Sequence, residues 1–345
     1  MSNLKEQAKQ LWKECFADSD AFIDLYFSKR YRDDITDVAE EDGRVVAVLQ
    51  RIPYPLTYGG KLIPTAYVSG ACTHADFRNR GIMHRLLMQA HRRMYADGKL
   101  LSTLIPAEEW LKGYYARSGY AGCFQQAVEN KVGFEQSVDN PLLSLEFSRI
   151  DLDKPVEESL YAFFNAQLMK RDCCIQHTFE DFRVILADLH LSAGSLWVAC
   201  RKEGYAALAF CLPVDEEGTL RVEELVAADK VCADALSAHL MQVYRPRRME
   251  CRIRQGGTVS DLGMVRVIRA EHMLRLYARL HPDYVGVIEV EGDEALPQNN
   301  GCYRIEGGCC QRLAAPEASP LTLDVRRLAF FLFEGKHPYM SLMLN

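Results

Sequence analysis

The chain has 345 residues, of which 48% are hydrophobic and 26% are charged, as in a soluble globular protein with two or three domains. The formal net charge of −6 excludes a general nucleic-acid-binding protein, which needs a basic face, and is compatible with a cationic substrate. The charged N-terminus is unlike a signal peptide, and no apolar run approaches the roughly 20 residues that span a bilayer, so we expect a cytoplasmic protein without a membrane partner.

Hydrophobic periodicity predicts alternating helices and strands in the first 120 residues. In chain order the predicted elements are helices over 4–15 and 21–27, a strand over 44–51, a hairpin turn over 58–61, a strand over 66–73, a helix from Ile82 to about Gly98, a strand over 100–105 and a helix over 110–117. The third of these helices is expected to turn Leu86, Leu87, Ala90 and Met94 toward the core.

The pattern restarts near residues 139–141. Helices are predicted over 156–170, 179–189 and 233–244, and strands over 196–200, 206–212 and 220–227. The strand, link and helix at 220–244 resemble the unit at 66–94 in shape, but they lack its glycine and arginines. The last third is predicted to form a small α+β domain with helices over 271–280 and 324–333, strands over 285–290, 302–305 and 310–313, and a buried apolar tail.

Twelve cysteines are present, but no CxxC spacing occurs among them. The sequence therefore indicates neither a metal site nor a redox pair, and most cysteines are expected to be reduced and buried.

The strongest chemical signal is the segment RNRGIM at 78–83, which lies between a predicted strand and a predicted helix. The start of a helix offers unpaired N–H groups and partial positive charge to a phosphate, and Gly81 lets an anion approach the main chain. Arg78 and Arg80 add flanking charge. For this fragment alone, an ordinary helix start with solvated arginines is an equally good interpretation.

The surrounding sequence resembles the GCN5-related N-acetyltransferase (GNAT) family. The loop is similar to the family pattern Q/R-x-x-G-x-G/A, the strand VSGACT at 68–73 precedes it, and YYARSGY at 114–120 is similar to (F/Y)Y-x-x-x-G-(F/Y). Met83 departs from the pattern, since the family usually has a small residue there.

This resemblance implies acetyl-CoA as the co-substrate and no metal. Its pantetheine arm would be bound by Ala71, Cys72 and Thr73, and its phosphates by Asn79, Arg80, Gly81, Ile82, Met83 and His84. Tyr115 would be the general acid for the departing thiolate, the alternative being a core aromatic residue.

A base is also needed to take a proton from the attacking ammonium. Glu108, at the end of the predicted strand over 100–105, is a candidate, and Glu109 and His74 are weaker ones. For each of them the alternative is a solvated surface group.

Over its whole length the chain resembles the enhanced-intracellular-survival branch of the family. This implies an α+β fold with mixed sheets, in which a GNAT fold occurs twice and a small sterol-carrier-like domain follows. The expected domains are residues 1–138, 139–268 (without cofactor) and 269–345. In this branch the terminal carboxylate acts as base, a role that falls to Asn345 here, and homo-oligomers are common.

We therefore expect direct acetyl transfer to a primary amine of a small molecule or of lysine. The alternatives are a non-catalytic protein that binds coenzyme A or a lipid-like ligand, and a structural protein with a vestigial domain. A ping-pong route through the Cys72 thiol is conceivable, whereas a packing role for Cys72 is the simpler interpretation.

Overall fold

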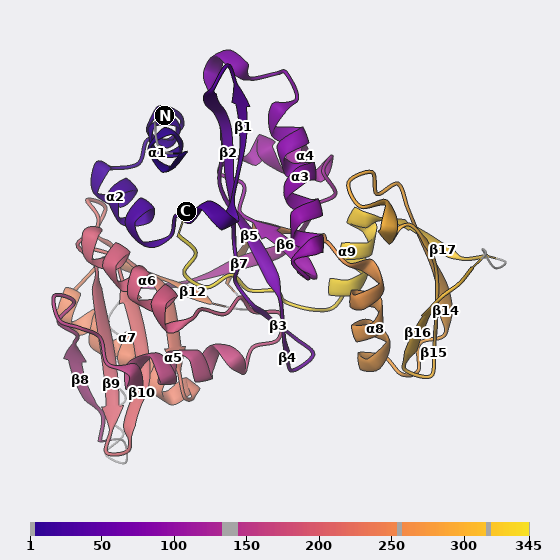
Figure 1. The fold of residues 1–345 in the computed structure, drawn as a ribbon. Helices are drawn as coiled ribbons and strands as arrows, with labels where there is room; N and C mark the ends of the chain where they lie inside the picture. Colours follow the sequence, from indigo (N-terminus) through magenta and orange to yellow (C-terminus); the bar gives the residue numbers. More distant parts are fainter. Residues whose placement is uncertain (1–3, 133–143, 254–256, 315–318, 345) are drawn as a thin grey trace. The chain divides into compact units, whose positions relative to one another are not determined.

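A computed structural model describes residues 4–132, 144–253, 257–314 and 319–344 (Figure 1). The fold is a mixture of helices and mixed β-sheets, as predicted, and it divides into two compact units. The first unit contains Met1–Phe124 and Asp261–Pro338, and the second contains Gln125–Ser260 and Tyr339–Leu344. Each unit is thus built from separate stretches of chain. The division into three contiguous domains stays a prediction. The expected start of the central domain, near residues 139–141, lies outside the described residues.

The first unit has helices on both sides of a mixed sheet in the order β1-β2-β5-β6-β13. Its N-terminal elements are α1 (Leu4–Cys15), α2 (Asp20–Lys29), β1 (Thr36–Glu41), β2 (Arg44–Ile52), β3 (Leu56–Tyr58), β4 (Lys61–Ile63), β5 (Thr65–Thr73), α3 (Ile82–Ala96), β6 (Leu101–Leu104), α4 (Glu109–Ala116) and the start of β7 (Ala121–Lys131). β13 (Thr258–Val267) completes the sheet. Among the described pairings of this sheet, β5 and β6, which the helix α3 connects, are parallel, whereas β1–β2, β2–β5 and β6–β13 are antiparallel.

Helix α3 covers the sheet of the first unit with the face that the sequence predicts. Leu86, Leu87, Ala90 and Met94 are all buried and pack with side chains of β2 and β5. Gly98, just beyond the end of the helix, has φ +75°, which is the left-handed conformation that ends many helices.

The first unit also contains a smaller sheet, in the order β16-β15-β14-β17. Its elements are α8 (Ala270–Leu280), β14 (Gly286–Glu291), β15 (Gly301–Glu306), β16 (Cys309–Arg312), β17 (Leu321–Asp324) and α9 (Val325–Phe333). Both helices pack on this sheet (Figure 1). Helix α9 also reaches the N-terminal half of the unit, because Tyr58 Oη donates a hydrogen bond to the Leu332 carbonyl (2.8 Å).

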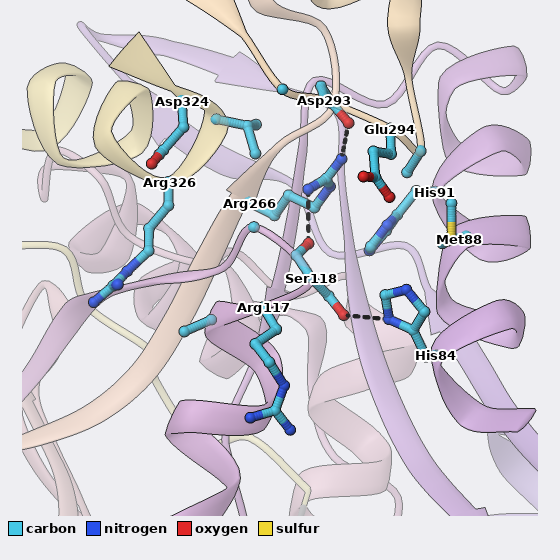
Figure 2. A pocket seen from close by; sticks show the side chains of 15 residues that line it. His84, Met88, His91, Arg117, Ser118, Arg266, Asp293, Glu294, Asp324 and Arg326 are labelled. Atoms are coloured by element: carbon cyan, nitrogen blue, oxygen red, sulfur yellow. Dashed lines mark hydrogen bonds and ion pairs between the residues drawn. The ribbon is translucent and has the colours of Figure 1, made fainter. Parts of the chain in front are cut away.

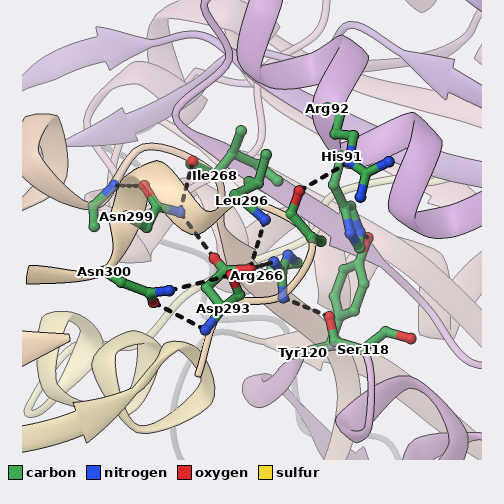
Figure 3. Close-up of polar contacts among 12 residues, drawn as sticks. His91, Arg92, Ser118, Tyr120, Arg266, Ile268, Asp293, Leu296, Asn299 and Asn300 are labelled. Carbon is green, nitrogen blue, oxygen red and sulfur yellow. Dashed lines mark hydrogen bonds and ion pairs between the residues drawn. The ribbon is translucent and has the colours of Figure 1, made fainter. Parts of the chain in front are cut away.

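A buried ion pair joins β13 to the loop that follows β14 (Figure 3). The guanidinium of Arg266 donates to Asp293 at 2.5 Å and to the Ser118 carbonyl at 2.6 Å. Asn299 donates to the second oxygen of Asp293 at 2.9 Å. Because the buried carboxylate is satisfied on several sides, the small sheet is held to the rest of the unit by polar contacts as well as apolar ones.

The second unit repeats the strand arrangement of the first. Its sheet has the order β7-β12-β11-β10-β9-β8, with one parallel pair, β11 and β12, connected by α7. Its elements are α5 (Glu158–Met169), α6 (Phe179–Leu191), α7 (Lys230–Tyr244), β8 (Glu146–Arg149), β9 (Ser195–Arg201), β10 (Gly204–Cys211), β11 (Thr219–Ala227) and β12 (Arg248–Ile253). The same strand–helix–strand topology therefore occurs twice, once in the segment β5–α3–β6 and once in the segment β11–α7–β12.

The apolar tail is anchored inside the second unit, as its composition predicts. Tyr339 Oη and Ser341 Oγ both donate hydrogen bonds to the buried carboxylate of Glu224, at 2.9 and 2.6 Å. Arg171 neutralises that carboxylate at 3.1 Å, and His177 Nε2 lies 2.7 Å from the Ser341 carbonyl oxygen.

Within the described parts of the chain, every helix is too short or too polar to cross a bilayer.

Candidate functional site

Strand β5 separates from its parallel neighbour β6 after the first third of its length. The two strands pair from Thr65 and Leu101 to Tyr67 and Thr103, whereas β5 continues to Thr73. On its other edge β5 carries one extra residue against β2: Val48 pairs with Cys72 and Gln50 with Ser69. Such a bulge bends the strand and strengthens its twist. The end of β5 thus leaves an edge whose main-chain groups can bind an extended ligand.

Helix α3 begins at this open end of the sheet, directly after a tight loop. Asn79 and Gly81 both have positive φ, at +62° and +69°. Alternation of left-handed and ordinary conformations turns successive N–H groups toward one point and makes an anion-binding concavity. No side chain caps α3, and its first turn has no acidic residue, so its N-terminal N–H groups stay available.

The arginines of the loop stabilise its main chain. Arg78 Nε donates to the Thr73 carbonyl at 3.0 Å, Arg80 donates to that of Asp76 at 2.8 Å, and Arg85 donates to that of Arg80 at 3.0 Å. Because these side chains bind carbonyl oxygens, they hold the loop in shape without engaging its N–H groups.

A cavity of about 420 Å³ lies between the end of β5, the start of α3 and helix α4. This volume is within the usual range for small-molecule sites. Eight of the nine residues predicted to bind the cofactor line it: Ala71, Cys72, Thr73, Asn79, Gly81, Ile82, Met83 and His84. Arg80 does not line it, because its guanidinium turns back over the ring of Phe77, 4.8 Å from the centroid.

Other lining residues were not predicted from the sequence. They are Cys15, Phe16, Phe77, Trp110, Leu111, Tyr114 and Arg117, whereas Arg78, which the sequence predicts to add charge beside the ligand, also lines the cavity. Four of them, Cys15, Trp110, Leu111 and Tyr114, lie on α1 or α4. An apolar residue on a helix that lines a cavity cannot be told from one that faces the core by sequence alone, so only the three-dimensional fold identifies them.

Tyr115, the predicted general acid, lines the same cavity and is 8% exposed. Burial, and then the neighbouring Tyr120, Tyr114 and Cys72, raise its pKa above the ordinary value, so the phenol is protonated at neutral pH. The structure thus brings a proton donor beside Cys72 and the open end of β5.

The candidate bases lie outside the residues that line this cavity. Glu108 precedes α4 and accepts a hydrogen bond from Trp110 Nε1 at 2.6 Å, while Trp110 itself lines the cavity. Glu109 pairs with Lys112 at 2.7 Å. His74 lies 3.5 Å from Glu14. Asn345 lies outside the described residues. The assignment of the base to any of them stays a prediction.

A second, more polar cavity of about 330 Å³ adjoins the first, since His84 and Arg117 line both (Figure 2). His84 and Ser118 face each other across it, with Nδ1 and Oγ 3.4 Å apart. His91 is fully buried in its wall, and burial lowers the pKa of this imidazole. Its Nε2 lies 3.1 Å from Tyr120 Oη.

The second unit lacks the equivalent anion site at its corresponding helix. The side chain of Asp229 caps α7 by accepting a hydrogen bond from the Cys232 N–H at 2.8 Å. A carboxylate therefore occupies at α7 the place that is open at α3, and its charge opposes a phosphate.

Residues 2–123 match the family model of the acetyltransferase (GNAT) domain. No curated protein matches the sequence.

Several solved structures share the fold of nearly the whole chain. A GCN5-related N-acetyltransferase from Anabaena variabilis has 14% identity and a TM-score of 0.79, with 97% of this chain and 96% of that chain covered. A GCN5-related N-acetyltransferase from Kribbella flavida has 15% identity and a TM-score of 0.75, with 99% and 95% covered. Eis1 from Mycobacterium abscessus has 17% identity and a TM-score of 0.74, with 94% and 85% covered. At these identities the likeness concerns the fold alone. The first 123 residues therefore match the acetyltransferase (GNAT) domain, and the cavity beside β5 and α3 lies within that matched part.

Proposed function

We propose that this protein is an acetyl-CoA-dependent N-acetyltransferase that acetylates a primary amine of a small molecule or of lysine. One observation carries the proposal: the edge of β5 that β6 leaves free, the uncapped start of α3 and the Tyr115 phenol all border a single cavity. The strand edge would bind the amides of acetyl-CoA, the start of α3 would bind its phosphates, and Tyr115 would protonate its thiolate as it leaves.

The residues around the cavity fit such a co-substrate. The pantetheine arm carries amides, which the main chain of Ala71 and Thr73 can bind once β5 has left β6. A pyrophosphate would bind in the concavity at Asn79 and Gly81, and Gly81 leaves the main chain there without a Cβ.

The bound thioester supplies an activated acetyl group, and the chain supplies orientation and proton transfer. Tyr115, whose pKa is raised by burial, holds its proton at neutral pH and donates it to the sulfur as the thiolate leaves. The attacking amine must first lose a proton, for which Glu108 or the terminal carboxylate of Asn345 is the proposed acceptor. Attack is direct, and no enzyme side chain is acetylated.

A non-catalytic role in binding coenzyme A is the alternative function. A protein that only binds coenzyme A would use the same contacts with β5 and α3, but it would not need the protonated phenol of Tyr115 in the same cavity. The assignment to the enhanced-intracellular-survival branch, the sterol-carrier likeness of the small sheet, the cytoplasmic location and a homo-oligomeric state likewise remain proposals.

Turnover of acetyl-CoA with a panel of primary amines tests the proposal. We expect acetylated product with at least one polyamine, aminoglycoside or lysine peptide, and a large loss of kcat in Tyr115→Phe. Coenzyme A binding without turnover on any of these amines would favour the alternative. A variant extended by several residues beyond Asn345 tests the terminal carboxylate: an unchanged rate would assign the base to another group.

A further inference from the structure

Two free cysteines from distant parts of the sequence meet in the wall of the cavity. Cys15 ends α1, and Cys72 lies on the part of β5 that extends beyond β6 and pairs with β2 alone. Cys15 Sγ lies 3.6 Å from the carbonyl oxygen of Thr73, the residue that follows Cys72, and the two thiols are close enough to influence each other's pKa. Both line the cavity, so a reagent that enters it reaches them.

The packing of α1 on β5 fixes this encounter. Gly70 on β5 has φ +59°, and the indole of Trp12 fills the space beside it where a side chain would otherwise stand. Trp12 lies one helical turn before Cys15, so seating the indole on the bulge places the end of α1 beside Cys72.

The two thiols are chemically unequal. A hydrogen bond from Cys72, together with the hydrogen bond and charge of Arg78, lowers the pKa of Cys15 to about 7, although burial and Glu14 oppose the shift. The hydrogen bond to Cys15 and burial raise the pKa of Cys72 well above its ordinary value. Cys15, the more exposed of the two, is therefore the more readily ionised thiol, and the buried Cys72 is its neutral partner.

Other cysteines of the chain lack this environment. Burial raises the pKa values of Cys123, Cys211 and Cys251, which makes them weak nucleophiles. Cys309, on β16, is an exposed free thiol, which makes it an internal reference for accessibility without a partner.

We propose that Cys15 and Cys72 are a peroxide-oxidisable thiol pair, with Cys15 as the attacking thiol and Cys72 as the resolving thiol. The Cys15 thiolate attacks one oxygen of hydrogen peroxide; the S–O bond forms, the O–O bond breaks, and hydroxide leaves to become water. Cys72, after losing its proton, attacks the resulting sulfenic acid at sulfur; the S–S bond forms and the S–O bond breaks with release of a second water. Two thiols are oxidised and one peroxide is reduced to two waters.

The consequence for ligand binding rests on the proposed function. The disulfide would link the end of α1 to the stretch of β5 that is proposed to bind pantetheine, so the oxidised protein should bind coenzyme A more weakly. By linkage, coenzyme A bound in the cavity should slow the oxidation, since it covers the route by which peroxide reaches Cys15.

The test compares the wild-type chain with Cys15→Ser, Cys72→Ser and the control Cys309→Ser. Each is treated with hydrogen peroxide, its remaining thiols are blocked by alkylation, and its peptides are mapped by mass spectrometry. We expect a peptide pair cross-linked through Cys15 and Cys72 in the wild type and in Cys309→Ser, lost on reduction with dithiothreitol. In Cys72→Ser, dimedone should trap the sulfenic acid on Cys15. Folded wild-type protein in which Cys309 is oxidised while Cys15 and Cys72 stay unlinked would overturn the proposal.

Coenzyme A binding to the reduced and oxidised proteins separates the two claims. We expect oxidation to weaken binding about tenfold or more, which corresponds to about 1.4 kcal/mol, and reduction to restore it. If the reduced protein does not bind coenzyme A, the proposed function fails, whereas the peptide map still decides whether the thiol pair exists. Equal affinity of both forms would overturn the proposed coupling between the disulfide and the ligand.

Discussion

The indole of Trp12 lies where a Cβ atom of residue 70 would have to stand, so α1 can pack on β5 only because residue 70 is glycine. Gly70 is also in the left-handed region, at φ +59°, inside the bulge that opens the strand edge. Gly70 thus permits both the bend of β5 and the packing of α1, the helix that carries Cys15, against that strand.

Gly70→Ala should destabilise the protein by about 2–4 kcal/mol, since left-handed strain of about 1 kcal/mol adds to an overpacking penalty of roughly 1–3 kcal/mol. The matched control is Gly43→Ala, at φ +75° with no atom within 4 Å of its Cβ position, which introduces the strain alone. The free energies of unfolding of both variants, measured by urea denaturation, test this difference. Equal losses would mean that the contact with Trp12 is unimportant.

Gly81→Ala should weaken coenzyme A binding about tenfold or more, because the new Cβ stands at the start of α3 and strains the left-handed N-cap. Gly98→Ala is its control at the other end of the same helix, also left-handed at φ +75° and with open space around the Cβ position. Both should lose about 1 kcal/mol of stability, but only the first should lose affinity. Titration calorimetry distinguishes them, and a similar loss of affinity in both would contradict a phosphate site at Gly81.

Tyr115→Phe should lower kcat roughly 100-fold or more while leaving the affinity for coenzyme A nearly unchanged, since it removes only the proton donated to the leaving thiolate. Tyr120→Phe is the matched control from the same motif. Its hydroxyl bonds Ser102 Oγ at 2.7 Å in the core, so it should lose about 1 kcal/mol of stability and little kcat. Steady-state kinetics at saturating acetyl-CoA separate these effects. A Tyr115→Phe enzyme with undiminished kcat would remove the phenol from the mechanism.

Alkylation of Cys15 should accelerate as pH rises through about 7, because the thiolate is the reactive form and the pKa of Cys15 lies near that value. Arg78 lowers this pKa, while Glu14 raises it. Arg78→Ala should therefore shift the midpoint of the rate profile to higher pH, and Glu14→Gln should shift it lower. The measurement is the iodoacetamide rate at Cys15, followed by mass spectrometry. A pH midpoint that is unchanged by both substitutions would contradict the electrostatic account of this thiol.

Asp293→Ala should destabilise the protein by about 3–5 kcal/mol, because it leaves the buried guanidinium of Arg266 without its counter-charge. Asp24→Ala, which breaks the surface pair with Lys9, serves as the comparison and should leave the thermal unfolding midpoint unchanged within error. Differential scanning calorimetry of both variants tests the contrast.

Local sequence was enough to predict the parts of the fold that depend on neighbouring residues. The hairpin with Gly59 and Gly60, the start of α3 at Ile82 and the inner face of that helix all follow from turn chemistry and periodicity, and the structure confirms them. Strand β1 was not predicted, because it carries polar residues such as Asp37, which is fully buried against Arg51. Strand β13 was also missed, since its pairing with β6 joins residues far apart in the chain.

The candidate site divides in the same way. Gly81 and Tyr115 belong to linear motifs, so the amino-acid sequence alone predicts them as site residues, and both line the cavity. The side chains that complete the cavity, among them Cys15 and Trp110, belong to ordinary helical patterns and become recognisable only when α1 and α4 are placed against β5. The contact between Cys15 and Cys72 has no spacing signature for the same reason.

The most direct test is titration of the reduced, folded wild-type protein with coenzyme A by isothermal calorimetry. The cavity at β5 and α3 predicts one site per chain with micromolar affinity, a range typical of enzyme substrates, and weakened binding in Gly81→Ala but not in Gly98→Ala. No heat of binding at millimolar coenzyme A, or equal binding in both glycine variants, would contradict it.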